Sequence, residues 1–181
     1  TMMGRLMREK LANEIEKDLG GGNKVKVFDA KSVHYLGISN GGTFGFVLAS
    51  TMPELERAVM VVGGGGLIHF MQRSVVWNGY QPLFELLYKD PRELQLVLAV
   101  IQTSLDPIDA MNYVPHLVED RFPGRKPLKA AIHLAINDSQ VDNLVSEWVL
   151  RSAQVPMITP SPKAIWGVET ITAAAPGGAP A

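Results

Sequence analysis

The sequence predicts an α/β domain built on a mostly parallel sheet with helices on both faces. Short apolar runs of β-favouring residues recur along the chain, as is typical of strands that are buried on both sides. Helical stretches separate these runs, so that strands and helices alternate. We assign residues 1–172 to this domain and expect the Ala/Gly/Pro-rich residues 173–181 to be disordered.

The first half of the chain is expected to contain two buried strands and the helices around them. Residues 5–19 carry leucine, methionine or isoleucine at about every fourth position with charges between, which predicts an amphipathic helix. Residues 24–28 fit a short strand or a loop. The run 32–38 fits a buried strand leading into a helix at 44–50, and a second buried strand at 58–62 stops at four consecutive glycines.

The second half continues the alternation after a helical region. Helices at 83–87 and 92–101 are its clearest elements. A third buried strand is expected at 130–136, an amphipathic helix at 141–153 and a fourth strand at 155–159.

Composition excludes several function classes. A net charge of −1 gives no electrostatic reason to expect a nucleic-acid partner. The absence of cysteine excludes a disulfide scaffold, a thiolate metal site and a cysteine nucleophile. No apolar run is long enough to span a bilayer. We expect no metal, because the acidic residues lack histidine partners at ligand spacing; these are Asp106, Asp109, Glu119 and Asp120.

One motif carries chemistry. Residues 37–41 read Gly-Ile-Ser-Asn-Gly, a G-x-S-x-G pattern that follows an apolar strand and precedes a helix, as a nucleophile elbow requires. The sharp turn strains the serine backbone, and side chains at Gly37 and Gly41 are expected to collide. The turn lifts the Ser39 hydroxyl above the sheet, with the Asn40 amide directed at a developing oxyanion. The alternative is a glycine-rich turn without catalysis.

Around this motif the sequence resembles the α/β-hydrolases. Residues 29–42 resemble the approach to the nucleophile, and residues 52–59 resemble the passage to the next strand. Gly63–Gly66 and residues 137–141 resemble a subgroup of large bacterial hydrolases, so the resemblance covers about residues 5–168. It implies a serine hydrolase that cleaves a small-molecule carboxylic ester, in preference to an amide, through an acyl-enzyme on Ser39 and without a cofactor.

The family order of the triad is serine, acid, histidine. The resemblance places the acid after the third strand, at Asp138, with Asp142 as the competitor; Asp138 can instead cap the following helix. We favour Asp138 as the acid. Ser39 is expected at the end of a central strand with strained backbone angles, and Asp138 at the same carboxyl edge of the sheet.

The family's histidine position, after the fourth strand, holds no histidine in this chain. His34 and His133 fall inside predicted strands, and His69 and His116 lie between the second and third strands. The family also has several strands before its elbow. We therefore expect a hydrolase core that is incomplete at both ends and that has almost no catalytic activity as it stands.

Alternatives to a complete esterase remain open. The chain can be a non-catalytic hydrolase-like binding domain or an inactive fragment. A Rossmann-like nucleotide binder would need an acidic residue after the second strand, where Gly63 stands. Gly63–Gly66 lacks the G-K-[ST] ending of a phosphate loop. One set of aromatic residues is either a packed helix face or an acyl-binding wall; its members are Trp77, Tyr80, Phe84 and Tyr88.

Overall fold

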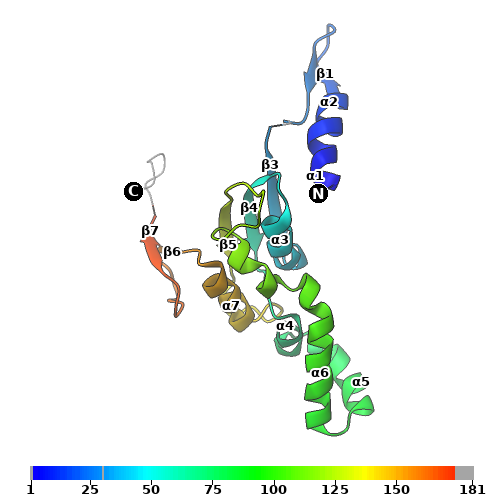
Figure 1. Cartoon of the computed structure of the whole chain (residues 1–181), viewed down its shortest axis with the longest axis vertical. Helices are drawn as coiled ribbons and strands as arrows, with labels where there is room; N and C mark the ends of the chain where they lie inside the picture. Colours follow the sequence, from blue (N-terminus) through cyan, green and yellow to red (C-terminus); the bar gives the residue numbers. More distant parts are fainter. Residues whose placement is uncertain (1, 30, 174–181) are drawn as a thin grey trace.

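A parallel sheet of three strands forms the centre of the computed structural model, which describes residues 2–29 and 31–173. The strands are β3 (Val33–Ile38), β4 (Leu55–Val61) and β5 (Lys129–His133), in the order β3-β4-β5. Both pairs are parallel. All three strands therefore end at the same edge of the sheet, which we call the carboxyl edge (Figure 1). The molecule is a mixed α/β structure with this sheet packed against helices.

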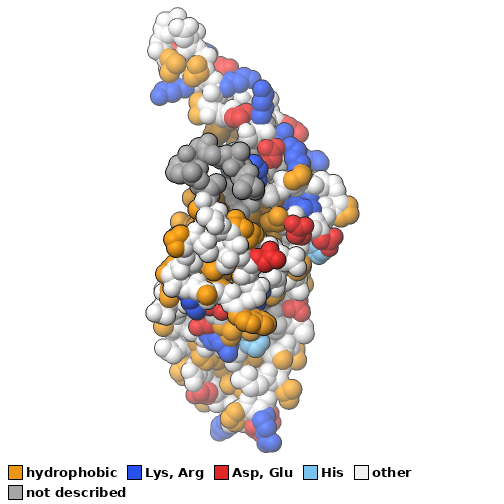
Figure 2. Space-filling view, turned by 90° about the vertical axis from the view of Figure 1, so that its left-hand side faces the viewer, with side chains coloured by type: hydrophobic (Ala, Val, Ile, Leu, Met, Phe, Trp, Pro, Cys, Tyr) orange, Lys and Arg blue, Asp and Glu red, His pale blue; other side chains and the backbone are white. Residues whose placement is uncertain are grey.

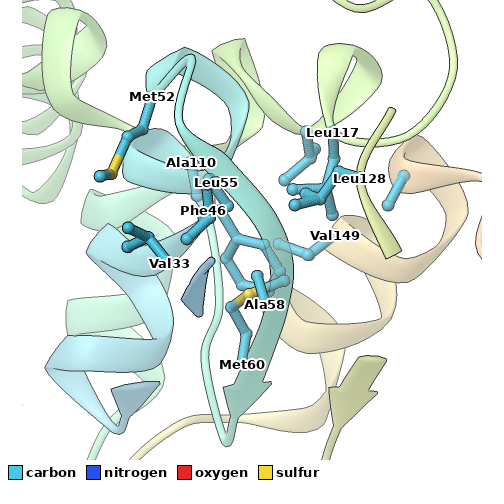
Figure 3. Close-up of a cluster of buried hydrophobic side chains, with 13 residues drawn as sticks. Val33, Phe46, Met52, Leu55, Ala58, Met60, Ala110, Leu117, Leu128 and Val149 are labelled. Carbon is cyan, nitrogen blue, oxygen red and sulfur yellow. The ribbon is translucent and has the colours of Figure 1, made fainter. Parts of the chain in front are cut away.

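Helix α3 (Asn40–Thr51) joins β3 to β4 and packs on one face of the sheet. Its Phe46 is fully buried between the strands and α7 (Asn143–Ala153), which contributes Val149 (Figure 3). The alternating burial of β3 and β4 explains this packing, because every second side chain points toward α3. The remaining members of this core are Val33, Ala49, Met52, Leu55, Ala58, Met60, Ala110, Val114, Leu117, Leu128 and Ala153.

The opposite face of the sheet is exposed, which differs from the prediction. Helices were expected on both faces, but Leu36 and Ile38 on β3 are 66% and 61% exposed. Ala131 on β5 is exposed too, on the same face. Within the described residues, β3 is also an edge strand rather than a central one. Within residues 2–29 and 31–173, no strand pairs with the outer edge of β3, and no helix covers the exposed face of the sheet.

Three helices between β4 and β5 form a second packed unit. They are α4 (Leu67–Arg73), α5 (Trp77–Leu87) and α6 (Pro91–Leu105). Their buried side chains meet in a separate cluster formed by Ile68, Trp77, Leu94 and Leu98. We call α4–α6 the insertion. The helices predicted at 83–87 and 92–101 are confirmed, and both are longer than predicted. Helix α6 starts at Pro91 and is capped by Asp90, which accepts from the Arg92 amide.

Short 3-10 turns lead from the insertion back to the sheet. They are η2 (Asp106–Ile108), η3 (Ala110–Asn112) and η4 (Val114–His116). Two of them, η3 and η4, contact both α3 and α7. This return segment therefore helps to close the main core.

The N-terminal helix ends earlier than predicted. The chain is helical from Met2 to Glu14, in three consecutive pieces: α1 (Met2–Arg5), the π-helical η1 (Leu6–Leu11) and α2 (Ala12–Glu14). A hairpin of β1 (Glu16–Asp18) and β2 (Lys24–Lys26) follows it. The three glycines Gly20–Gly22 all have positive φ, and they form the hairpin turn in place of a helix end.

The fourth predicted strand does not join the main sheet. It is the short β6 (Met157–Thr159), which pairs in parallel with β7 (Thr170–Thr172). The backbone of a strand needs hydrogen-bond partners, and β7 supplies them for β6 in a separate sheet of two strands. Of the predicted disordered tail, residues 174–181 lie outside the described residues.

The surface mixes acidic and basic side chains, as Figure 2 shows for one face. Among residues 2–29 and 31–173, no helix has the length and hydropathy needed to cross a membrane.

Candidate functional site

Ser39 stands between β3 and α3 with φ 55° and ψ −119°. Positive φ is rare for a residue with a side chain, and strain of this kind costs on the order of 1–3 kcal/mol. Contacts on both sides of Ser39 impose the conformation. Its amide donates to the carbonyl of Val61 at 3.0 Å, and its carbonyl accepts from the amide of Thr43 at 2.9 Å. The strand–turn–helix context predicted for the motif is thus present.

Of the two glycines that the turn was expected to require, Gly37 is required and Gly41 is not, while Gly42 is required where α3 approaches β4. A Cβ on Gly37 would overlap the Gly41 carbonyl, and a Cβ on Gly42 would lie 2.6 Å from the Val61 carbonyl oxygen. A Cβ on Gly41 itself would meet only the Tyr35 hydroxyl at 3.7 Å, an ordinary contact. The predicted collision therefore arises between the Gly37 side and the Gly41 backbone, while Gly42 lets α3 approach β4.

The first turn of α3 offers donors beside Ser39. Helix amides in this position have no acceptor within the helix and lie at the positive end of its dipole. Among the described residues, none accepts a hydrogen bond from the Asn40 amide. This amide is therefore available to donate a hydrogen bond to a ligand oxygen beside Ser39.

The Gly63–Gly66 loop directs its amides inward. Ser146 Oγ also donates to the Gly63 carbonyl at 3.1 Å. A Cβ on Gly63 would lie 2.6 Å from the Gly42 carbonyl carbon, so the loop packs directly against the start of α3. The acceptors of its amides are Thr43 Oγ1 for Gly64, the Val145 carbonyl for Gly65 and Asp109 Oδ1 for Gly66. These bonds leave the three amides unable to cradle a phosphate.

Asp138 lies on the loop after β5, at the same carboxyl edge as Ser39. Its Oδ1 accepts hydrogen bonds from the amides of Gln140 (2.8 Å) and Val141 (2.9 Å). The cap of α7 is Asp142, which accepts from the Leu144 amide at 2.9 Å. The helix-cap alternative therefore applies to Asp142 and not to Asp138.

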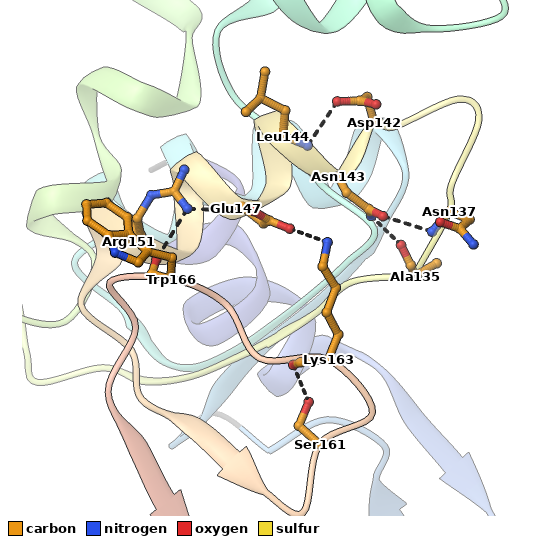
Figure 4. A network of polar contacts seen from close by, with 10 residues as sticks. All are labelled: Ala135, Asn137, Asp142, Asn143, Leu144, Glu147, Arg151, Ser161, Lys163 and Trp166. Atoms are coloured by element: carbon orange, nitrogen blue, oxygen red, sulfur yellow. Dashed lines mark hydrogen bonds and ion pairs between the residues drawn. The ribbon is translucent and has the colours of Figure 1, made fainter.

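Helix α7 also braces the Asp138 loop (Figure 4). Asn143 Oδ1 accepts from the Asn137 amide at 2.8 Å, and its Nδ2 donates to the Ala135 carbonyl at 2.6 Å. Asn137 adopts φ 59°, so the loop bends sharply just before Asp138. Farther along α7, Glu147 accepts from Lys163 Nζ at 2.7 Å and pairs with Arg151 at 3.7 Å. The Asp138 loop is therefore fixed from a rigid element.

The four histidines are not assembled with Ser39 or Asp138. His69, on α4, packs edge-on against Trp148 with ring centroids 5.4 Å apart. His116 Nδ1 lies 2.8 Å from the Asp120 carbonyl oxygen. His34 and His133 lie on the exposed positions of β3 and β5. In the part of the chain that the structure describes, no hydrogen bond or ion pair joins a histidine to Ser39 or Asp138.

The aromatic residues of α5 divide into two groups. Trp77, Phe84 and Tyr88 pack within the insertion, and the Trp77 and Phe84 rings are 5.2 Å apart. Tyr80 is 50% exposed. Three of the four thus form a packed helix face, and the acyl-wall alternative does not account for them.

Other groups that could bind ligands lie away from Ser39. A cavity of about 470 Å³ is lined by Glu119, Arg151 and Gln154, among others, and none of the predicted site residues lines it. Among the described residues, no cluster of three or more histidine, aspartate or glutamate side chains could hold a metal ion.

Asp109 has a structural role that the sequence did not indicate. The sequence indicated it only as one of several acidic residues that lack the partners of a metal site, yet its side chain is 1% exposed and both of its carboxylate oxygens accept hydrogen bonds. A carboxylate followed by a short turn gives no signal of a partner 43 residues earlier in the chain.

No protein-family model matches this chain, and no curated protein matches it significantly.

Proposed function

We propose that this chain carries the nucleophile of an α/β-hydrolase-type serine esterase, and that Ser39 is that nucleophile. The observation that supports this most is the strained backbone of Ser39, with φ 55° at the carboxyl end of a parallel strand. Strain of this kind persists only where its surroundings impose it, and it concentrates at functional sites. Active sites of parallel α/β sheets form at this edge.

In the proposed reaction the Ser39 oxygen attacks the carbonyl carbon of a carboxylic ester. The Asn40 amide stabilises the oxyanion that forms, the alcohol leaves, and water then releases the acid from the acyl-enzyme. A histidine accepts the Ser39 proton and returns it to the alcohol, and Asp138 orients that histidine. Esters are favoured over amides because the oxygen of an alcohol is a better leaving group than the nitrogen of an amine.

The base is the open part of this proposal. Within the described residues no hydrogen bond joins any of the four histidines to Ser39. The base is therefore either His69 or His116 after a movement, or a histidine from polypeptide beyond these residues. This separation is also the observation that favours the second candidate, a hydrolase-like domain that binds a ligand without turnover.

Turnover of a short-chain activated ester decides between the two. Residues 1–181 alone and the longest natural form of the chain are assayed, each beside its Ser39→Ala variant. We expect the short form to be nearly silent, because loss of the base in such enzymes costs about a million-fold in turnover. We expect the long form to hydrolyse the ester only when Ser39 is present.

Two results would change the proposal. Ser39-dependent turnover by residues 1–181 would require an internal base, which His69→Ala and His116→Ala would identify. A long form without Ser39-dependent turnover would favour the non-catalytic binding domain.

A further inference from the structure

Asp109 binds the start of α4 from the far end of the insertion. Its carboxylate accepts from the Gly66 amide at 2.8 Å and from the Leu67 amide at 2.6 Å. It also accepts from the Met111 amide at 2.9 Å and from Gln102 Nε2 at 2.8 Å. Because the Asp109 side chain is only 1% exposed, these four donors replace the water that its carboxylate would otherwise need.

Gln102 completes the same arrangement. Its Oε1 accepts from the Ile68 amide at 2.9 Å while its Nε2 donates to Asp109. Three consecutive amides at the start of α4, those of Gly66, Leu67 and Ile68, are therefore bound by side chains of the return segment and of α6. Helix α4 has no capping side chain of its own, and its N-cap is Gly66. Asp109 and Gln102 supply that cap from a distance.

The start of α4 lies where the proposed chemistry takes place. Helix α4 follows β4, the middle strand of the sheet. On one side of β4 lies β3, which ends just before Ser39, and on the other side lies β5, which leads to Asp138. The preceding loop packs on the first turn of α3 through Gly63. At the other end of α4, the Val75 amide donates to the Ser139 carbonyl at 2.9 Å, next to Asp138. Helix α4 thus bridges the loop beside Ser39 and the loop of Asp138.

We propose that Asp109 is a positioning residue that holds the insertion across the carboxyl edge, so that α4 forms a fixed wall for the acyl or alcohol part of the ester. This inference rests on the proposed function of Ser39. Ser39 itself is held by β4 and α3, through Val61 and Thr43, so its reactivity does not depend on Asp109. Loss of Asp109 therefore changes which substrates fit, and not how reactive Ser39 is.

The first experiment measures amide hydrogen exchange in the Asp109→Asn variant. An asparagine presents its NH₂ group to donors that previously met an oxygen, so part of the cap is lost. We expect exchange at Gly66, Leu67 and Met111 to accelerate by about tenfold or more, as expected for local opening of a segment. The amides of β4 should keep their protection.

Asp90→Asn is the matched control. Asp90 caps the start of α6 in the same insertion, where it binds Arg92, and within the described residues it makes no hydrogen bond to α4, Gln102 or Asp109. We expect it to leave the exchange of α4 unchanged. If Asp109→Asn does not fold, Gln102→Met tests the same cap through Ile68, with a smaller change in the same direction.

The second experiment separates positioning from general damage. Labelling of Ser39 is timed in the longest natural form of the chain with two fluorophosphonates, one with small alkyl groups and one with a long alkyl chain. We expect Asp109→Asn to slow the long-chain probe by about tenfold or more, because displaced binding contacts cost rates of this order. The small probe should react at the unchanged rate.

The outcomes are distinguishable. Equal slowing of both probes, or no change in either, overturns the positioning role. If α4 exchange is unchanged in Asp109→Asn, the distant cap itself is refuted. If neither probe reacts with Ser39 in the unsubstituted protein, the proposed function fails together with the substrate wall, and exchange still shows whether Asp109 holds the insertion.

Discussion

The carbonyl oxygen of Gly41 occupies the space that a side chain on Gly37 would need. The Tyr35 hydroxyl donates to this carbonyl at 2.6 Å and keeps it in place. Consequently the chain can turn from β3 into α3 within this short distance only with glycine at position 37. The conformation of Ser39 depends on that turn.

Gly37→Ala is expected to lower the free energy of unfolding by about 2 kcal/mol or more, because the added methyl group forces the backbone of Gly41 to move. Urea unfolding measures this. The control is Gly79→Ala in α5, where a Cβ meets nothing within 4 Å. Alanine there should stabilise by about 1 kcal/mol through helix propensity. Equal effects of the two substitutions would refute the steric account.

Ser39→Gly should make the protein more stable. Glycine adopts φ 55° without the penalty that a Cβ imposes, so we expect a gain of about 1 kcal/mol in the free energy of unfolding. Ser39→Ala keeps the Cβ and should leave stability nearly unchanged. Both variants should lose any Ser39-dependent turnover. A glycine variant no more stable than the alanine variant would show that Ser39 is not strained.

The acid is tested by comparing two aspartates. If Asp138 orients the histidine, Asp138→Asn should lower turnover by about 10⁴-fold in the active form of the protein. Asp142→Asn is the control, since asparagine caps a helix about as well as aspartate and can still accept from the Leu144 amide. The kinetic constant to compare is kcat for an activated ester. The reverse pattern would assign the acid to Asp142.

Stability toward acid should depend on one ion pair between β4 and the segment that leads into β5. Lys126 donates to Glu56 at 2.6 Å and holds the pKa of Glu56 below its ordinary value of 4.5. A carboxyl with a lowered pKa in the folded state stabilises the fold above its unfolded pKa, and this contribution is lost as the pH falls through the folded pKa.

Glu56→Gln should therefore lower the unfolding temperature at neutral pH and have little effect below the folded pKa of Glu56. High salt should reduce the difference at neutral pH, because both side chains are partly exposed. A difference that is constant across this pH range would mean that the pair does not contribute through its charge.

The local pattern of the chain predicted the strands and helices around Ser39, because burial alternates with a period that the sequence displays. The helix at 5–19 was wrong beyond Glu14, since the glycines after Leu19 close a hairpin instead of ending a helix. The predicted place of β6 was also wrong, because strand pairing depends on which partner the fold brings beside the strand, here β7, and not on the residues of β6 alone.

For the site, the sequence placed Ser39 and Asp138 after parallel strands, and topology puts the ends of such strands at one edge. The distant cap formed by Asp109 and Gln102 could not be predicted, because it joins residues more than thirty positions apart.

The central claim is that Ser39 is a nucleophile. The most direct measurement is mass spectrometry of the longest natural form of the chain after reaction with a small fluorophosphonate, with the adduct located by peptide sequencing. We predict a single adduct on Ser39, absent when the protein is unfolded before the reaction. An adduct on another serine, such as Ser74 or Ser139, or labelling that persists after unfolding, would contradict the account.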